Sequence, residues 1–302
     1  MITIYLRWTG IVVREPSVAA FDQDTNEIIA VGEAARSISG RPSGNIAAVH
    51  PLTGGVIANY TVTERMLRYF MQKAIGRRTL RRPRVCMSVP CGASEVERDA
   101  VRSAALEAGA RDVTLIDGPA AAALGAGIDI SRACGNLVID MGAGTTDIAV
   151  ISLGMTASSK TLKVAGNDFD EVLVRYMRRE HGLSGNTGNS TGPHLHFEIR
   201  IGGVAARASD LTMNVKGRDI TTGMPKTVAV SANETIRAFR ENVRHITEGL
   251  RQVLEDTGPE LSSDIAMRGI LHVPAGTYGR HRYRIVDRDS LYTGGVPYEF
   301  IH

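Results

Sequence analysis

One stretch of eight residues combines the side chains and backbone that can hold a phosphate group. In order they are Asp140, Met141, Gly142, Ala143, Gly144, Thr145, Thr146 and Asp147. The two glycines have no Cβ, so backbone N–H groups can approach an anion closely. The two threonines add hydroxyl donors, and the flanking aspartates could hold a hydrated Mg²⁺. The stretch therefore predicts a phosphate-binding turn, with an ordinary glycine-rich turn as the alternative.

The flanking sequence determines the element that carries this turn. Apolar runs of strand length stand on both sides, at 137–139 and 148–151. Two such runs joined by a short Gly/Thr link predict a β-hairpin. No Gly-Lys-Ser/Thr follows the glycines, so the turn is not a Walker loop.

Length and composition permit a soluble globular protein with one large core or two lobes. The chain has 302 residues, with 43% apolar and 22% charged residues and a formal net charge of +3. That charge is too small to indicate a nucleic-acid partner. The three cysteines, Cys86, Cys91 and Cys134, show no metal-site spacing and cannot all pair, which suits a reducing cytoplasm. No apolar run reaches membrane-spanning length, and the start lacks a signal-peptide pattern.

Helical and strand patterns alternate along the first half, which predicts an α/β domain. Ser94 and Glu97 form a capping box that starts a helix ending near Gly109. The other expected elements are a helix over 63–74, a strand over 84–90, a strand over 112–116 and an Ala-rich helix from Pro119.

The second half begins with the hairpin and continues with a strand over 160–164 and a helix over 169–179. A long helix is expected over 233–256, where Ser231 and Glu234 form a second capping box. Its apolar positions recur every three or four residues and predict a stripe facing the core. They are Ile236, Phe239, Val243, Ile246, Leu250 and Val253.

Taken together, these motifs resemble the actin/Hsp70-like ATPases, and the bacterial actins of the MreB type in particular. The hairpin is similar to the second phosphate loop of that family. Ordered matches run from about Ile4 to Gly182 and again from about Leu211 to Ile270. Among them are Gly10–Val18, Ala30–Ala35, Gly40–Ile46, Gly55–Tyr60, Val96–Val101, Ala108–Asp112, Val215–Asp219 and Pro259–Ile265.

The resemblance implies an actin-like ATPase fold with two lobes around a nucleotide cleft. Domain I would cover 1–132, and domain II would cover 133–270 with an atypical insert at 184–208. Residues 271–302 stay unassigned. ATP and Mg²⁺ are the implied cofactors. Residues 142–146 of the turn (Gly-Ala-Gly-Thr-Thr) would contact phosphate, and Asp140 would hold the Mg²⁺ through water.

Three departures from the family pattern bear on catalysis. The family's first phosphate hairpin should precede Ile4, but Met1 stands there, so the chain is expected to be truncated at its N-terminus. The family's Gly-rich adenosine turn is replaced by 272–279, a divergent C-terminal region. The family places Glu-Glu-Pro before the Ala-rich helix, where this chain has Asp117-Gly118-Pro119. Asp140 and Asp117 are the catalytic candidates, and only residual ATPase activity is expected.

By the same resemblance the protein would determine cell shape. It would assemble with itself into filaments in the cytoplasm, against the inner face of the membrane, together with the wall-elongation machinery. An arginine-rich loop lies where the family has its membrane-insertion loop, and attraction to anionic lipid is the functional interpretation. A solvated charge run is the alternative. The expected membrane contacts are Arg77, Arg78, Leu80, Arg81 and Arg82.

A different function class comes from 188–199, which resembles the closing motif of lysostaphin-type zinc endopeptidases that cut peptidoglycan. His194 and His196 would face the same side of a strand, as two metal-site imidazoles should. The resemblance implies that His196 would ligate the zinc and that His194 would assist the chemistry. The family's further ligands come from an upstream His-x-x-x-Asp. The upstream histidines, His50 and His181, have glycine at that offset. No metal site is therefore expected, and a zinc peptidase, a non-hydrolysing filament subunit or a non-functional chimeric fragment remain the alternatives.

Overall fold

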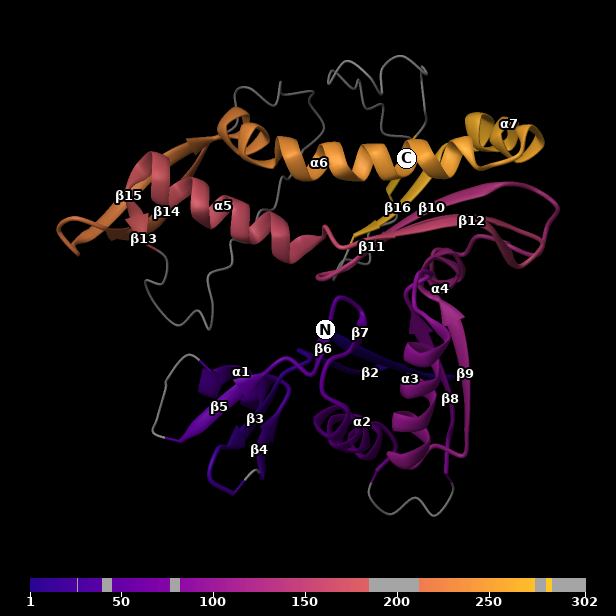
Figure 1. The fold of residues 1–302 in the computed structure, drawn as a ribbon, viewed down its shortest axis with the longest axis horizontal. Helices are drawn as coiled ribbons and strands as arrows, with labels where there is room; N and C mark the ends of the chain where they lie inside the picture. Colours follow the sequence, from indigo (N-terminus) through magenta and orange to yellow (C-terminus); the bar gives the residue numbers. More distant parts are fainter. Residues whose placement is uncertain (26, 40–44, 77–81, 185–211, 275–280, 284–302) are drawn as a thin grey trace.

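The computed structural model describes the chain except for residues 26, 40–44, 77–81, 185–211, 275–280 and 284–302. Two lobes are visible in Figure 1. The first-lobe strands are β1 (Ile2–Leu6), β2 (Gly10–Glu15), β3 (Ala19–Asp22), β4 (Ile28–Val31), β5 (Ile46–Val49), β6 (Leu52–Thr53), β7 (Val56–Ile57), β8 (Arg84–Val89) and β9 (Asp112–Asp117). Its helices are α1 (Glu33–Ser39), α2 (Tyr60–Ile75), α3 (Glu95–Glu107) and α4 (Gly118–Gly125).

The second lobe follows from β10 onward (Figure 1). Its strands are β10 (Asn136–Met141), β11 (Thr146–Ser152), β12 (Met155–Leu162), β13 (Leu183–Ser184), β14 (Thr212–Asp219), β15 (Pro225–Ser231), β16 (Ile270–Pro274) and β17 (His281–Tyr283). Its helices are α5 (Gly166–His181), α6 (Ala232–Glu255) and α7 (Pro259–Arg268). The expected alternation of helices and strands is therefore present, with boundaries shifted by a few residues.

The first lobe packs its helices on short sheets. β8 and β9 correspond to two of the expected strands and pair in parallel, and α3 begins at the expected capping box of Ser94 and Glu97. α2 begins at Tyr60, three residues earlier than expected, because the Asn59 side chain accepts a hydrogen bond from the Val62 N–H and caps the helix there. Its buried residues Met66 and Phe70 form a core with β2 and β4.

β1 and β2 form an antiparallel hairpin with an unusual tip. Trp8 lies in the connection, is 88% exposed and adopts a positive φ of 79°. A bulky side chain is strained in that conformation. The Arg7 guanidinium carbon lies 4.8 Å from the centroid of the Trp8 ring, a cation–π contact at the surface.

A five-stranded sheet of order β12-β11-β10-β16-β17 forms the centre of the second lobe. β10 and β11 pair antiparallel, so the expected hairpin is present, and β16 lies parallel beside β10. The segment that begins at residue 271 thus contributes a strand to this sheet. The sheet is buried on both faces, which explains the continuous apolar runs. One face packs on α6 and α7, and the other packs on α4.

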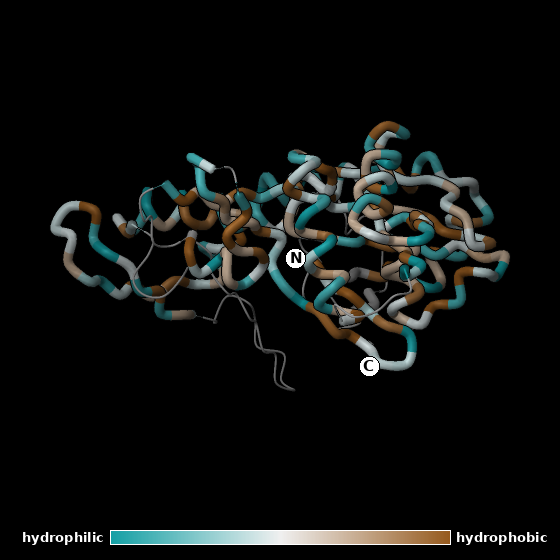
Figure 2. Tube along the Cα trace, turned by 90° about the horizontal axis from the view of Figure 1, so that it is seen from below, coloured by the Kyte–Doolittle hydropathy of each residue, from teal (hydrophilic) through white to brown (hydrophobic). Residues whose placement is uncertain are grey.

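α4 therefore connects the lobes. It follows directly from β9 of the first lobe, and Ala120 and Ala123 pack on Val138 and Ala149 of the second-lobe sheet. Small side chains permit this close packing. Figure 2 shows hydrophobic segments in both lobes, and the apolar clusters of α2 and of β10–β11 confirm that each lobe has its own core.

The apolar stripe predicted for α6 is wrong at Ile236 and Val243, whereas Phe239 of the same half packs on a core of the second lobe. Ile236 is 56% exposed and Val243 is 50% exposed, while Leu250 and Val253 are buried as expected. The helix turns a face of small and polar residues inward as well, because a Cβ on Gly249 would lie 2.7 Å from the Leu162 side chain of β12. At this position α6 therefore lies close to β12, and a larger residue than glycine would collide with Leu162.

α5 and the N-terminal part of α6 pack on a smaller sheet of order β13-β14-β15. Its core contains Leu173 and Met177 of α5 and Val230 of β15. The Phe169 and Phe239 rings meet edge to face at 5.0 Å between centroids. α5 begins at Gly166, three residues before the expected start, so its first turn lies beside the glycine-rich turn.

Candidate functional site

A cleft of about 1010 Å³ opens between the lobes and contains the glycine-rich turn. The first lobe lines it with the β2–β3 connection, the β6–β7 turn, the end of β8 and Gly118 at the start of α4. The second lobe lines it with Asp140, residues 142–145, Asp147 and the first two turns of α5. The volume is at the upper end of the range of sites for small molecules.

The turn is held by backbone hydrogen bonds on two sides. The Gly142 N–H donates to the Thr145 carbonyl at 2.8 Å and closes the turn. The Gly166 N–H donates to the Gly142 carbonyl at 3.1 Å, and the Asn167 N–H donates to the Ala143 carbonyl at 2.8 Å. The start of α5 therefore supports the turn from behind, at a helix N-terminus, which favours anions.

Close packing explains why glycine occupies this turn. A Cβ on Gly144 would lie 3.2 Å from the Gly54 nitrogen of the β6–β7 turn, and a Cβ on Gly166 would lie 3.3 Å from the Gly142 carbonyl oxygen. A side chain at either position would push the two lobes or the two turns apart. The backbone of the turn thus forms a shallow cradle in which N–H groups stay accessible to an anion.

The two threonines of the turn have different environments. Thr145 lines the cleft. Thr146 is fully buried in β11 and does not line it, and its hydroxyl donates to the Val164 carbonyl at 2.7 Å. The Thr146 hydroxyl therefore supports the second lobe, whereas the Thr145 hydroxyl lies at the cleft and is hydrogen-bonded to Asp147.

Two carboxyl groups face each other across the base of the hairpin, since Asp140 and Asp147 are directly paired residues. Burial, and then the negative charge of Asp147, raises the pKa of Asp140 to about 6. Burial also raises the pKa of Asp147, although hydrogen bonds from Thr161, the Cys91 backbone and Thr145 oppose that increase. A cation at Asp140 would offset the cost of burying its charge.

Asp117 does not line the cleft in this structure. Its carboxylate accepts a hydrogen bond from Arg98 at 2.8 Å and another from the Thr156 hydroxyl at 3.0 Å. Gly118, by contrast, lines the cleft, and a Cβ there would lie 3.0 Å from Oδ2 of Asp140. Gly118, which lies next to Asp140, therefore carries no side-chain functional group.

The sequence reasoning missed four charged or titratable residues that line the cleft. Asp170 and Glu171 come from the first turns of α5, and Arg36 and His50 come from the first lobe. The only signal for the acidic pair was their place just after the Gly166-Asn167-Asp168 segment. Arg36 and His50 reach the cleft through tertiary structure alone.

Two groups of expected site residues fall wholly or largely outside the described part of the chain. Of the arginine-rich loop, Arg82 is described and exposed, whereas Arg77, Arg78, Leu80 and Arg81 lie outside the described residues. His194 and His196 also lie outside them. Within the described residues, no three His, Cys, Asp or Glu side chains come together as a metal site. No helix in the same part of the chain is long and apolar enough to cross a membrane.

Comparison with known proteins places this geometry in a family. The family model described as MreB/Mbl protein matches residues 1–278. The chain is 40% identical to the cell shape-determining protein Mbl of Bacillus cereus over 275 residues, which cover 91% of this chain and 81% of that protein. It is 39% identical to the cell shape-determining protein MreB of Escherichia coli K12 over 300 residues, covering 97% of this chain and 84% of that protein.

Solved structures agree with this assignment. MreB5 of Spiroplasma citri bound to ADP superposes with a TM-score of 0.79 at 33% identity, covering 96% of this chain and 85% of that one. The AMPPNP-bound form of that protein gives a TM-score of 0.75 at 32% identity, with 95% and 84% covered. The chain belongs to the MreB/Mbl family and has its actin-like ATPase fold, with two lobes around a cleft.

Proposed function

We propose that this protein is an actin-like cytoskeletal protein that binds Mg²⁺–ATP in the interlobe cleft and helps to determine cell shape. The observation that carries the proposal is the glycine cradle of residues 142–145, which lies beside Asp140 in a cleft of about 1010 Å³. Solved relatives bound to ADP and AMPPNP support a nucleotide as the ligand.

The residues of the cleft fit a nucleotide that carries a divalent cation. The backbone N–H groups of Ala143 and Gly144 would bind phosphate oxygens, since the Gly142 N–H donates to the Thr145 carbonyl and the Thr145 hydroxyl is bonded to Asp147. Asp140 would hold the Mg²⁺ through water, a common arrangement because Mg²⁺ in phosphate sites keeps several waters and uses one or two carboxylates. The bound cation would neutralise phosphate charge next to the acidic wall of the cleft.

Hydrolysis should be slow. The family's acid that orients the attacking water has no counterpart at Gly118, which lines the cleft beside Asp140. The nearby carboxylate of Asp117 is already bound by Arg98 and Thr156. Catalysis of phosphoryl transfer to water depends on positioning that water, so turnover near background is expected.

The proposal extends to assembly and location. We infer that the protein forms filaments with copies of itself in the cytoplasm, on the inner face of the membrane, where it would organise wall elongation. The names of the Mbl and MreB relatives, which are cell shape-determining proteins, support this inference. The arginines of 77–82 supply the expected lipid contact, with each contributing about 1 kcal/mol near an anionic surface.

Nucleotide binding is the first test. Titration of fluorescent ADP and ATP into the purified full chain should show binding that strengthens when Mg²⁺ is added. Electron microscopy of the same samples should show filaments with Mg²⁺–ATP. No binding of either nucleotide at millimolar concentration would overturn the assignment of the cleft.

Membrane attachment needs its own test. The protein should co-sediment with vesicles that contain anionic lipid at low salt and be released as salt rises, because the attraction is a screened Coulomb interaction. Replacing Arg77, Arg78, Arg81 and Arg82 with serine should abolish binding. Leu80→Ser should weaken it less. Binding that ignores both salt and these changes would mean that another part of the chain contacts the lipid.

A further inference from the structure

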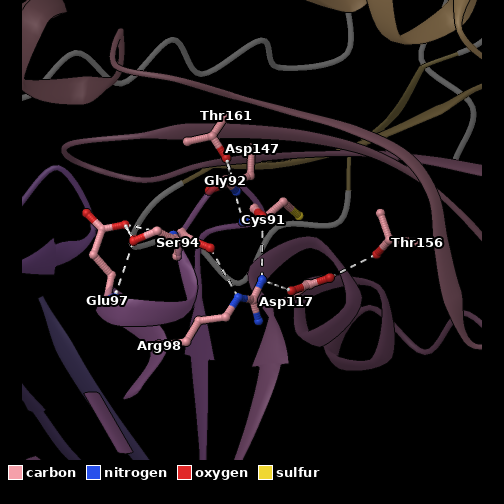
Figure 3. Close-up of polar contacts among 10 residues, drawn as sticks. Cys91, Gly92, Ser94, Glu97, Arg98, Asp117, Asp147, Thr156 and Thr161 are labelled. Carbon is pink, nitrogen blue, oxygen red and sulfur yellow. Dashed lines mark hydrogen bonds and ion pairs between the residues drawn. The ribbon is translucent and has the colours of Figure 1, made fainter. Parts of the chain in front are cut away.

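A second contact joins the lobes beside the glycine-rich turn, and it is made of polar groups (Figure 3). The turn after β8 carries two N–H groups that point into the second lobe. The Cys91 N–H donates to Oδ1 of Asp147 at 3.0 Å, and the Gly92 N–H donates to the Thr161 hydroxyl oxygen at 2.8 Å. The Thr161 hydroxyl in turn donates to the same Oδ1 of Asp147. The three bonds form a closed polar cluster between β11, β12 and the β8–α3 turn.

The first-lobe side of this cluster is held rigidly. The capping box of Ser94 and Glu97 fixes the start of α3 directly after the turn. Arg98 reaches back and donates to the Ala93 carbonyl at 3.3 Å and to the Cys91 carbonyl at 3.4 Å. The two amides that bind the second lobe therefore lie on a backbone whose carbonyls are also bound, as Figure 3 shows.

Arg98 also ties this turn to a neighbouring interlobe bond. It pairs with Asp117, whose other carboxylate oxygen accepts from Thr156 of β12. Thr156 and Thr161 lie on the same strand of the second lobe. The first lobe is thus hydrogen-bonded to β12 at two points, through Asp117 and through Gly92.

Close packing leaves no room for a side chain larger than that of glycine at position 92. A Cβ there would lie 2.9 Å from the Thr161 hydroxyl oxygen and 3.0 Å from its Cβ. Asp147 is 4% exposed, and it also bonds to the Thr145 hydroxyl of the cradle. One carboxylate therefore touches the interlobe contact and the ligand-binding turn.

We propose that Asp147 and Thr161 form an interlobe latch that fixes the first lobe against the phosphate turn, so that both act as positioning residues for the nucleotide. The proposal rests on the nucleotide function assigned to the cleft. Asp147 uses its Oδ1 for the first lobe and for Thr161, which leaves Asp140 as the carboxylate for the cation. Latch and cation site are thus neighbouring but separate.

Amide hydrogen exchange on the full chain tests the latch directly. In the nucleotide-free wild type, the Cys91 and Gly92 amides should exchange slowly because both are hydrogen-bonded. Thr161→Val removes the hydroxyl and should increase exchange at both amides, and it should weaken binding of fluorescent ADP with Mg²⁺ about tenfold, the size expected for losing a bond to a charged group. Gly92→Ala acts from the opposite lobe and should reproduce both effects.

Three controls separate a latch from general destabilisation. Thr161→Ser restores the hydroxyl and should restore both readouts. Thr114→Val makes the same chemical change at an exposed position of β9 and should change neither. Asp140→Ala should lower nucleotide affinity while exchange at Cys91 and Gly92 stays as in the wild type.

The outcomes distinguish the latch from the function it rests on. Unchanged exchange at both amides in Thr161→Val would overturn the latch, whatever the protein binds. Altered exchange with unchanged nucleotide affinity would overturn the positioning role. A wild type that binds no nucleotide yet shows slow exchange that Thr161→Val abolishes would overturn the proposed function and leave the interlobe contact standing.

Discussion

The two walls of the cleft differ in what they contribute. The second-lobe wall carries the glycine cradle and four carboxylates, those of Asp140, Asp147, Asp170 and Glu171. The first-lobe wall is lined mainly by backbone and by small or apolar side chains, and its basic side chains among the described residues are Arg36 and His50. Charge is thus concentrated on one side of the ligand.

This asymmetry has a chemical consequence. A nucleotide brings further negative charge next to four carboxylates, which is unfavourable unless a cation comes with it. We expect the second lobe to supply the carboxylates for that cation, since the first lobe lines the cleft with few charged side chains. We therefore expect binding and water activation to be separable, with the phosphate turn and Asp140 serving binding and Gly118 offering no group for activation.

The largest effect should follow from removing the charge of the second-lobe wall. Asp140→Ala should weaken Mg²⁺-dependent binding of fluorescent ADP by more than tenfold, because the bond of a charged group is worth about 1.5–3 kcal/mol. The melting temperature of the ligand-free protein should not fall, since burial disfavours the Asp140 carboxylate. Asp112→Ala, an exposed aspartate of β9, is the matched control. Equal affinities with and without Mg²⁺ in the wild type would contradict the assignment of the cation to this wall.

Adding a carboxylate to the first-lobe wall should test whether the lack of an acid on that wall limits hydrolysis. Gly118→Glu places a carboxylate near Asp140, where a Cβ lies 3.0 Å from Oδ2. Phosphate release from ATP should rise several-fold above the near-background wild-type rate, because a general acid–base group can contribute about 10²–10⁴-fold when well placed. Gly118→Gln has similar size without the charge and should stay at background. Equal ATP turnover in the wild type and in Gly118→Glu would show that Gly118 does not limit hydrolysis.

Lowering the pH should reveal the same difference between the two walls, with a smaller effect, by protonating Asp140. Burial, and then the charge of Asp147, raises the pKa of Asp140 from its ordinary value of 3.8 to about 6, so folding favours the protonated form. Its contribution to stability therefore increases as pH falls through about 6, while Mg²⁺, which needs the carboxylate, binds less well. Between pH 7.5 and 5.5, the ligand-free protein should become more stable relative to Asp140→Asn. Mg²⁺-dependent nucleotide affinity should drop in the wild type only.

The smallest effect concerns the support of the first-lobe wall. Ser94→Ala removes the cap of α3, next to the turn that follows β8. A lost N-cap costs about 1 kcal/mol, so the melting temperature should fall by a few degrees while nucleotide affinity changes little. Ser37→Ala, on exposed α1, is a control that leaves α3 intact. A tenfold loss of nucleotide affinity in Ser94→Ala would mean that the N-cap of α3 is needed to hold the turn after β8 in its binding position.

Local chemistry made much of this architecture predictable. The hairpin at 140–147 and the capping boxes at Ser94 and Ser231 depend on residues close in sequence, and the structure confirms all three. The orientation of individual side chains was harder to predict from the sequence. Asp117 turns to Arg98, 19 residues away, and the Thr146 hydroxyl turns to a carbonyl 18 residues away.

Tertiary packing also decides which side of a helix is inside. The apolar stripe of α6 predicts that Ile236 is buried, yet Ala232, Thr235 and Asn242 take the inward positions of this half of the helix and Ile236 is exposed. The cleft residues Arg36 and His50 could not be found from spacing, because the folding of the first lobe alone brings them to the second. Hydrophobic periodicity identifies a helix, but the surface on which the helix packs determines which of its residues are buried.

The exposed tip of the β1–β2 hairpin determines what an optical experiment on this protein would see. Trp8 is the one tryptophan in the chain, and it is 88% exposed. Its emission should already be red-shifted in the native state, so intrinsic fluorescence will report little of the melting of either core. The same property makes the residue a built-in probe without background, because any surface that covers the hairpin tip will shift its emission to shorter wavelength.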